Sequence, residues 1–280
     1  MCSILNSRRR TYLIILFVFL LTSCSQLRRV SNIFDRRSFR LDAIPPRSPE
    51  AISGSEFARR TAWMSEAERQ CAAVRELQRG NIPEFLRNLK RVRLSGTLSD
   101  GNAVTALLWV MPDYLAIGSD EDFLRIPLSY TSATTIANTF NCVLPTPKIV
   151  DVIYTQSTVR LRPQLLPPGP QMRTNAYALK HQNMIETQRA GHPLGALTSG
   201  HKKDVVLTNL LHRRSNRIAI YGWHWSIGNP IQPLSIRHGA TYADYSQGVR
   251  LVYQTVWIDG KPHSILDHLA RFGSGAGVDL

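Results

Sequence analysis

The chain has 280 residues, of which 43% are hydrophobic and 19% are charged, a composition typical of a folded protein. This composition excludes a chain that is disordered as a whole. A multi-span membrane protein is also excluded, because the one uninterrupted apolar run covers residues 12–21 and a membrane-spanning helix needs about 20 such residues. The 34 Lys and Arg residues outnumber the 20 Asp and Glu residues, so the formal net charge is +14.

The chain begins with the pattern of a targeting segment. Residues 8–10 are arginines, the apolar run follows, and residues 21–24 read Leu-Thr-Ser-Cys. A basic start, an apolar stretch and small residues near a cleavage point are typical of a secretion signal. The tetrapeptide resembles the lipobox of bacterial lipoprotein precursors. This resemblance implies a signal peptide at residues 1–23 and acylation of Cys24, palmitate being one such chain. An ordinary secretion signal and an uncleaved anchor are the alternatives.

The same resemblance predicts where the protein works. A lipidated Cys24 would bind membrane lipid and hold the protein in the bacterial cell envelope. Ser25 is not the aspartate that this family uses as an inner-membrane retention mark, so we expect the periplasmic face of the outer membrane. Without residues 1–23 the chain has 31 basic and 20 acidic residues, a net charge of +11. An exported basic protein meets anionic wall and surface polymers, so we expect such a partner and no nucleic acid.

The patterning predicts a tether followed by one domain. Residues 24–52 are rich in Arg, Ser and Pro and have no apolar periodicity, which indicates a flexible basic tether. We expect a single envelope domain over residues 53–280, with a candidate subdomain boundary at the Pro-rich residues 163–171. Two capping-box patterns, beginning at Ser53 and Ser65, predict one long helix or two helices that are separated near Ser65.

The remaining elements alternate irregularly between helix and strand patterns. Helices are predicted at residues 131–138, 147–154 and 176–188, and strands at residues 91–99, 102–111, 205–208, 217–226 and 249–258. Tight hairpin turns are expected at residues 100–101, 228–229 and 259–260, because Gly, Asn and Asp tolerate positive φ. The sequence therefore predicts an α+β fold, with N-terminal helices followed by a largely antiparallel sheet with helical insertions.

Two cysteines lie in the predicted domain. Cys71 follows Phe57 and Met64 at intervals of seven residues, which predicts a position on the buried apolar stripe of a helix. Cys142 begins a bend between two predicted helices. We expect two free, buried thiols; a disulfide between them and a reactive Cys142 are the alternatives, since the envelope permits disulfides.

The predicted strand 217–226 indicates a candidate site. With a period of two residues, His224 shares a face with aliphatic side chains, where a buried imidazole needs a partner. The opposite face would align Tyr221, Trp223 and Trp225, either as a sugar-stacking platform or as ordinary sheet packing.

Residues 201–245 contain the densest group of potentially catalytic side chains. His224, His238 and Asp244 are predicted to line one pocket, with Lys203 or Arg250 supplying positive charge. His201, His224 and His238 are the candidate ligands for zinc, because neutral imidazoles with a carboxylate suit that metal. The alternative for His224 is a core histidine that is satisfied by a backbone carbonyl.

Known envelope enzymes provide weak matches. Residues 246–250, Ser-Gln-Gly-Val-Arg, faintly resemble the L,D-transpeptidase signature, but its cysteine and histidine are absent. His238 and Asp244 do not have the spacing of zinc-dependent D-Ala-D-Ala carboxypeptidases, and the surroundings of Cys142 depart from those of NlpC/P60 peptidases. Two classes of function therefore stay open: a lipoprotein that binds an anionic polymer or partner, and an envelope hydrolase with a His/Asp site in residues 201–245. The sequence does not decide whether the protein is an enzyme.

Overall fold

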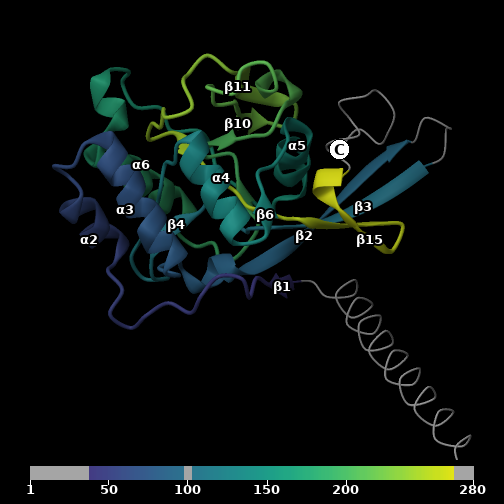
Figure 1. The fold of residues 1–280 in the computed structure, drawn as a ribbon, viewed down its shortest axis with the longest axis horizontal. Coiled ribbons are helices and arrows are strands. Elements are labelled where there is room, and N and C mark those ends of the chain that lie inside the picture. Colours follow the sequence, from purple (N-terminus) through teal and green to yellow (C-terminus); the bar gives the residue numbers. More distant parts are fainter. Residues whose placement is uncertain (1–37, 98–102, 268–280) are drawn as a thin grey trace, which may run out of the picture. The chain divides into compact units, whose positions relative to one another are not determined.

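The computed structural model describes residues 38–97 and 103–267, which form an α+β fold as predicted (Figure 1). Helices and strands alternate without a regular strand-helix-strand repeat. The helices are α2 (Gly54–Arg60), α3 (Glu66–Gln78), α4 (Tyr130–Thr139), α5 (Pro147–Gln156) and α6 (Asn175–Arg189), with short 3-10 turns η1 (Glu84–Arg87), η2 (Pro170–Arg173) and η3 (Asn209–Leu211). None of these helices has the length and apolar character needed to cross a membrane.

The larger sheet is antiparallel throughout. Its strands follow the order β1 (Ser38–Arg40), β2 (Asn88–Thr97), β3 (Ala103–Val110), β13 (Val252–Tyr253) and β6 (Cys142–Val143), and β3 also pairs with β14 (Thr255–Ile258), which pairs with β15 (Lys261–Ser264). The predicted hairpin β2–β3 is confirmed by eight paired positions, and its turn lies outside the described residues. The predicted turn of β14–β15 is also confirmed, because Asp259 and Gly260 both have positive φ.

A second sheet carries two of the predicted site residues, Lys203 and His224. Its order is β11 (Asn229–Ser235), β10 (Ile220–Ser226), β9 (Lys203–Val205) and β12 (Gln247–Gly248), and the pair β9–β12 is parallel. Two small sheets complete the fold. They are β4 (Ala116–Gly118) with β5 (Phe123–Arg125), and β7 (Val159–Arg160) with β8 (Thr198–Ser199).

Helix α5 joins the cores of the two large sheets. Thr146 caps its first turn and Pro147 occupies that turn, as the sequence predicts. Ile149 and Ile153 pack into the apolar core of the larger sheet, while Val150 packs with Ala219 beside β10. The helix therefore reaches both sheets, and its Asp151 contacts β10 of the second sheet.

The predicted tether ends earlier than residue 52. Ser38–Arg40 forms β1 and pairs with β2, and Leu41 and Ile44 are buried. The boundary was placed too late because the apolar residues of this stretch are few and have no period, although Leu41 and Ile44 are covered by the body of the domain. The Pro-rich stretch does not divide the described domain: Leu166 packs against Trp223 and Tyr245 within one compact unit.

The break between the first two helices is confirmed, and it corrects the prediction for Cys71. Ser65 and Glu68 form a complete capping box at the start of α3, after the turn at Thr61 that ends α2. A seven-residue spacing that crosses this break has no meaning as a helical stripe, since the helical register restarts at Ser65. Cys71 is exposed, whereas Cys142 is buried, and both thiols are free.

Candidate active site

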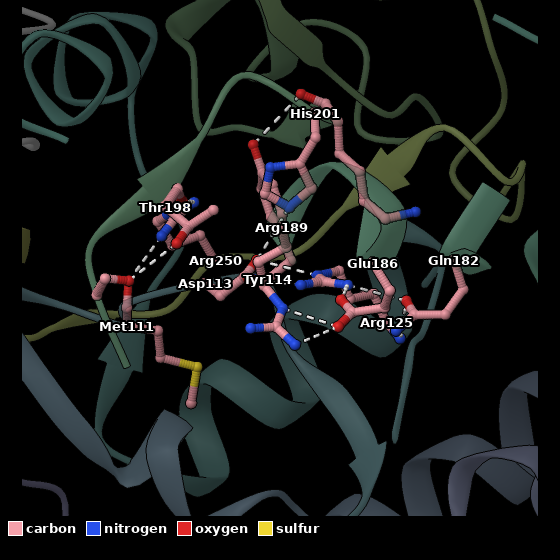
Figure 2. A network of polar contacts seen from close by, with 12 residues as sticks. Met111, Asp113, Tyr114, Arg125, Gln182, Glu186, Arg189, Thr198, His201 and Arg250 are labelled. Atoms are coloured by element: carbon pink, nitrogen blue, oxygen red, sulfur yellow. Dashed lines mark hydrogen bonds and ion pairs between the residues drawn. The ribbon is translucent and has the colours of Figure 1, made fainter. Parts of the chain in front are cut away.

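A fully buried carboxylate, Asp113, lies at the centre of a charged network (Figure 2). Arg125 of β5 donates to both of its oxygens, with Nε–Oδ1 and Nη2–Oδ2 distances of 3.1 and 2.7 Å. His201 Nε2 lies 3.0 Å from Asp113 Oδ1, and the backbone N–H of Tyr114 donates to the same oxygen. Burial alone would raise the pKa of Asp113, but the charges and hydrogen bonds of Arg125 and His201 outweigh it and hold this pKa well below its usual range.

Helix α6 completes this network from the other side. Arg125 Nη1 donates to Glu186 at 2.7 Å and to Gln182 at 3.1 Å, and Glu186 is also paired with Arg189. Figure 2 shows these side chains converging on Arg125. Both oxygens of Asp113 accept hydrogen bonds from Arg125, and one also contacts His201 and the N–H of Tyr114. The network therefore fixes the backbone around residues 113 and 201, and the Asp113 carboxylate is fully engaged in it.

Tyr114 connects this network to a second buried carboxyl group. Its hydroxyl donates to Asp204 Oδ2 at 2.7 Å, and its ring meets the ring of His201 edge to face. The guanidinium carbon of Arg250 lies 4.5 Å from the centroid of the same ring. The nitrogens of Arg250 also bind the carbonyl oxygens of Met111 and Thr198, so Arg250 holds the ends of β3 and β8 together.

Asp204 belongs to a narrow cavity with unusual polar groups, and the side chains around this cavity leave no room for a water molecule. Its residues include Tyr154, Ser199, His224 and Arg250. Among the described residues, Asp204 Oδ1, Ser199 Oγ and Arg250 Nε have no hydrogen-bond partner, although all three atoms are buried. Burial raises the pKa of Asp204 to about 7, more than Arg250 and Tyr114 lower it. Buried polar atoms without partners are uncommon in folded proteins, and three of the ten such atoms among the described residues lie around this one cavity.

His224 enters this cavity from β10 with a carboxylate behind it. Its Nε2 lies 2.8 Å from Asp151 Oδ1, and the hydroxyl of Tyr221 donates to the same oxygen at 2.9 Å. The ring is stacked on Tyr154, with centroids 4.6 Å apart and an interplanar angle of 21°. The pairing with Asp151 favours the tautomer with the proton on Nε2, and the stack fixes the orientation of the ring.

A bulge in β10 overturns the predicted alternation of its faces. Gly222 and Trp223 have φ values of 105° and 60°, and the pairing with β11 shifts on either side. Tyr221 and His224 therefore reach the same Asp151, although strict alternation would place them on opposite faces. Of the three predicted platform residues, Trp223 is buried, Tyr221 is half-buried and Trp225 is exposed.

Gly222 also explains how His224 comes close to Asp204. A Cβ atom at position 222 would lie 3.5 Å from Asp204 Oδ2, 3.5 Å from His224 Cε1 and 3.2 Å from Val150 Cγ1. The first two atoms are therefore at most 7.0 Å apart. A glycine leaves this space open and adopts the positive φ without strain.

The other predicted residues lie outside this cavity, His238 and Asp244 in the connection between β11 and β12. His238 is stacked on Tyr242, whose hydroxyl donates to Asp244 at 2.9 Å, so these two predicted residues share a neighbour. Neither lines the cavity of His224. Lys203 lies over the ring of Trp223. Within the described residues His201, His224 and His238 have separate neighbours, and no group of three or more His, Cys, Asp or Glu side chains is arranged to hold a metal ion.

Lys202, the residue before the predicted Lys203, has a more unusual environment than Lys203. Lys202 is buried, its Nζ donates to the carbonyl oxygen of Tyr245 at 2.7 Å, and it lies 3.5 Å from His181 Nδ1. Burial and then the charge of Arg125 lower the pKa of Lys202 to about 7. Such a lysine contributes a positive charge to the buried network only at neutral or lower pH.

Sequence reasoning missed Asp151 as a partner of His224. Helix α5 was interpreted by its apolar stripe alone, and Asp151 is the acidic residue that stands one turn before Tyr154 on this helix. Residues 246–250, which faintly resemble the L,D-transpeptidase signature, form β12 and the approach to β13, with a buried Val249 and with Arg250 lining the cavity.

No protein-family model matches the chain, and no curated protein or solved structure matches it. The site itself is therefore the basis for any statement about the class of protein.

Proposed function

We propose that this chain is a lipoprotein of the bacterial cell envelope whose domain is a hydrolase, with Asp204 and His224 as its acid–base pair. One observation supports it most: a buried carboxyl group with an unpartnered oxygen lines the same cavity as a histidine that is oriented by Asp151. General acid–base catalysis is most effective when the pKa of the group is near the working pH, and the pKa of Asp204 is about 7.

In this proposal the two groups have opposite tasks. Water and substrate enter in this proposal when the cavity widens. His224, whose Nε2–H is hydrogen-bonded to Asp151, then accepts a proton from the attacking water at Nδ1. Asp204, protonated at or below neutral pH, gives its proton to the leaving group of an ester, amide or glycosidic bond. The N–H of Arg250 Nε and the hydroxyl of Ser199 are the donors available to an oxyanion that forms beside them.

The proposed location depends on the N-terminal segment, which lies outside the described residues. We expect residues 1–23 to be removed and Cys24 to carry acyl chains, two or more of which give stable anchoring. Mass spectrometry of the N-terminal peptide from membrane fractions tests this expectation. A mature chain that starts at another residue, or an unmodified Cys24, would contradict it.

The enzymatic proposal is tested with the full chain in detergent micelles. The substrates are peptidoglycan fragments and p-nitrophenyl acetate, and the variants are Asp204→Asn and His224→Gln. We expect each variant to lose about 100-fold or more in kcat/KM, because general acid–base catalysis contributes about 10²–10⁴-fold. The matched control is His212→Gln, an exposed histidine outside the cavity, which should keep the wild-type rate.

The outcome can contradict the proposal in two ways. Wild-type rates in both cavity variants would exclude the site. No turnover of either substrate by the wild-type chain would favour the other class, a lipoprotein that binds an anionic polymer or partner.

A further inference from the structure

The second sheet contains a long stretch without acidic residues. No Asp or Glu occurs in residues 205–243, whereas four arginines do: Arg213, Arg214, Arg217 and Arg237. The chain as a whole has 20 acidic residues in 280, so an acid-free stretch of this length gives the surface built from it a concentrated positive charge.

The fold brings the two arginine-bearing segments together. Arg217 Nη1 donates to the carbonyl oxygen of Arg237 at 2.6 Å, and the backbone of Arg217 forms a bridge with Gly239. The N–H of Ile218 also donates to the carbonyl oxygen of His238 at 3.1 Å. Residues 213–217 and 237–239 therefore lie side by side at the base of the hairpin β10–β11, and we call this region the arginine surface.

The guanidinium groups of the arginine surface are available to a ligand. Within the described residues, none of these four arginines forms an ion pair, whereas Arg59, Arg60 and Arg173 each pair with a glutamate. Arg213, Arg214 and Arg237 are exposed. Asp204 and Asp244, the acidic residues that flank this stretch of the sequence, are buried, and within the described residues no ion pair joins them to these arginines.

Aromatic and apolar side chains accompany this charge. Trp225 and Ile227, at the tip of the same hairpin, are 48% and 60% exposed. His238 presents a ring that is stacked on Tyr242 with centroids 3.9 Å apart. The ring of His238 adjoins the arginines, whereas Trp225 lies at the other end of the hairpin. A ligand that uses both must therefore be a polymer extended along β10–β11. A polymer with carboxylates and sugar rings suits these groups, because arginine pairs with carboxylates through two N–H groups and aromatic rings stack on apolar faces.

We infer that the arginine surface binds an acidic polysaccharide, with guanidinium groups paired to its carboxylates and Trp225 stacked on a sugar ring. This binding does not require the cavity of Asp204 and His224, so its test is independent of the test for hydrolase activity.

The test measures binding of a polygalacturonate oligomer to the full chain in detergent micelles, at about 50 and about 200 mM salt. The triple variant Arg213→Gln, Arg214→Gln, Arg237→Gln should bind at least about tenfold more weakly at the lower salt concentration, and its affinity should depend less on salt. The matched control replaces three exposed arginines elsewhere, Arg75, Arg79 and Arg162, by glutamine and changes the net charge equally. It should stay within about threefold of wild type, because screening weakens distant charges.

Two further variants separate the alternatives. Trp225→Ala should weaken binding at both salt concentrations, since stacking is not screened by salt. Asp204→Asn should leave the affinity unchanged, whatever its effect on hydrolysis. Equal losses in the two triple variants would overturn the inference. A polyphosphate of the same charge that binds as tightly, with no effect of Trp225→Ala, would also overturn it in favour of simple charge attraction.

Discussion

The substitution Asp113→Asn tests the buried charged network most directly. Asparagine keeps the shape of the side chain but removes the negative charge that faces Arg125 and His201. Arg125 is fully buried and would keep only Glu186 as a charged partner. Removing one partner of a buried ion pair costs about 3–5 kcal/mol, because the other charge is left without compensation. We therefore expect the free energy of unfolding to fall by about 3–5 kcal/mol at pH 7.

The pH dependence of this difference has a definite sign. The pKa of Asp113 is lowered in the folded protein, so its contribution to stability is present above the unfolded pKa of about 3.9 and is lost as the pH falls toward the folded pKa. The stability difference between wild type and Asp113→Asn should thus be constant from about pH 7 to about pH 5 and should shrink only below about pH 4.

Urea denaturation followed by tryptophan fluorescence measures both quantities. The control is Asp42→Asn, because the side chain of Asp42 is 86% exposed and lies 3.7 Å from an exposed arginine. We expect the control to change the free energy of unfolding by less than about 1 kcal/mol. A loss below about 1 kcal/mol for Asp113→Asn, or a difference that already disappears between pH 7 and pH 5, would refute the reasoning.

Three other predictions concern the cavity and the thiols. Asp204→Asn should stabilise the protein by about 2–4 kcal/mol at pH 8 but not near pH 4, because a pKa raised to about 7 makes ionisation of the wild-type carboxyl costly only above its unfolded pKa. Urea denaturation at the two pH values checks this, and an equal effect at both would count against it. Gly222→Ala should lower the free energy of unfolding by about 1–3 kcal/mol and lower any activity, because residue 222 has a φ of 105° and a Cβ would lie 3.2 Å from Val150 Cγ1. Thermal denaturation followed by circular dichroism measures the loss, and an unchanged melting temperature would contradict the prediction. A maleimide should modify Cys71 in the folded protein but reach Cys142 only after denaturation, because Cys142 is buried and burial raises its pKa. Peptide mass spectrometry locates the label, and rapid labelling of Cys142 in the folded chain would contradict the structure.

The features that the sequence by itself determined are local ones. The capping box at Ser65, the turn at residues 259–260 and the buried stripe of α5 were all predicted correctly. Each depends on residues that are only a few positions apart, because a cap satisfies an N–H within one turn and a tight turn needs only its own φ values. Even the α+β class follows from such signals, since recurring hairpins without strand-helix-strand alternation indicate an antiparallel sheet.

The site depended on contacts that only the tertiary structure decided. His201 meets Asp113 across 88 positions of the chain, and His224 meets Asp151 across 73. The bulge at Gly222 breaks the alternation of β10 where the strand passes Asp204, so the period of two residues failed at the position that mattered most. Residue types are fixed by the sequence, but the charge state of an Asp, His or Lys depends on the water and the partners that surround it. Folding alone determines that surrounding, which is why Asp113 and Asp204, identical in chemistry, have pKa values shifted in opposite directions.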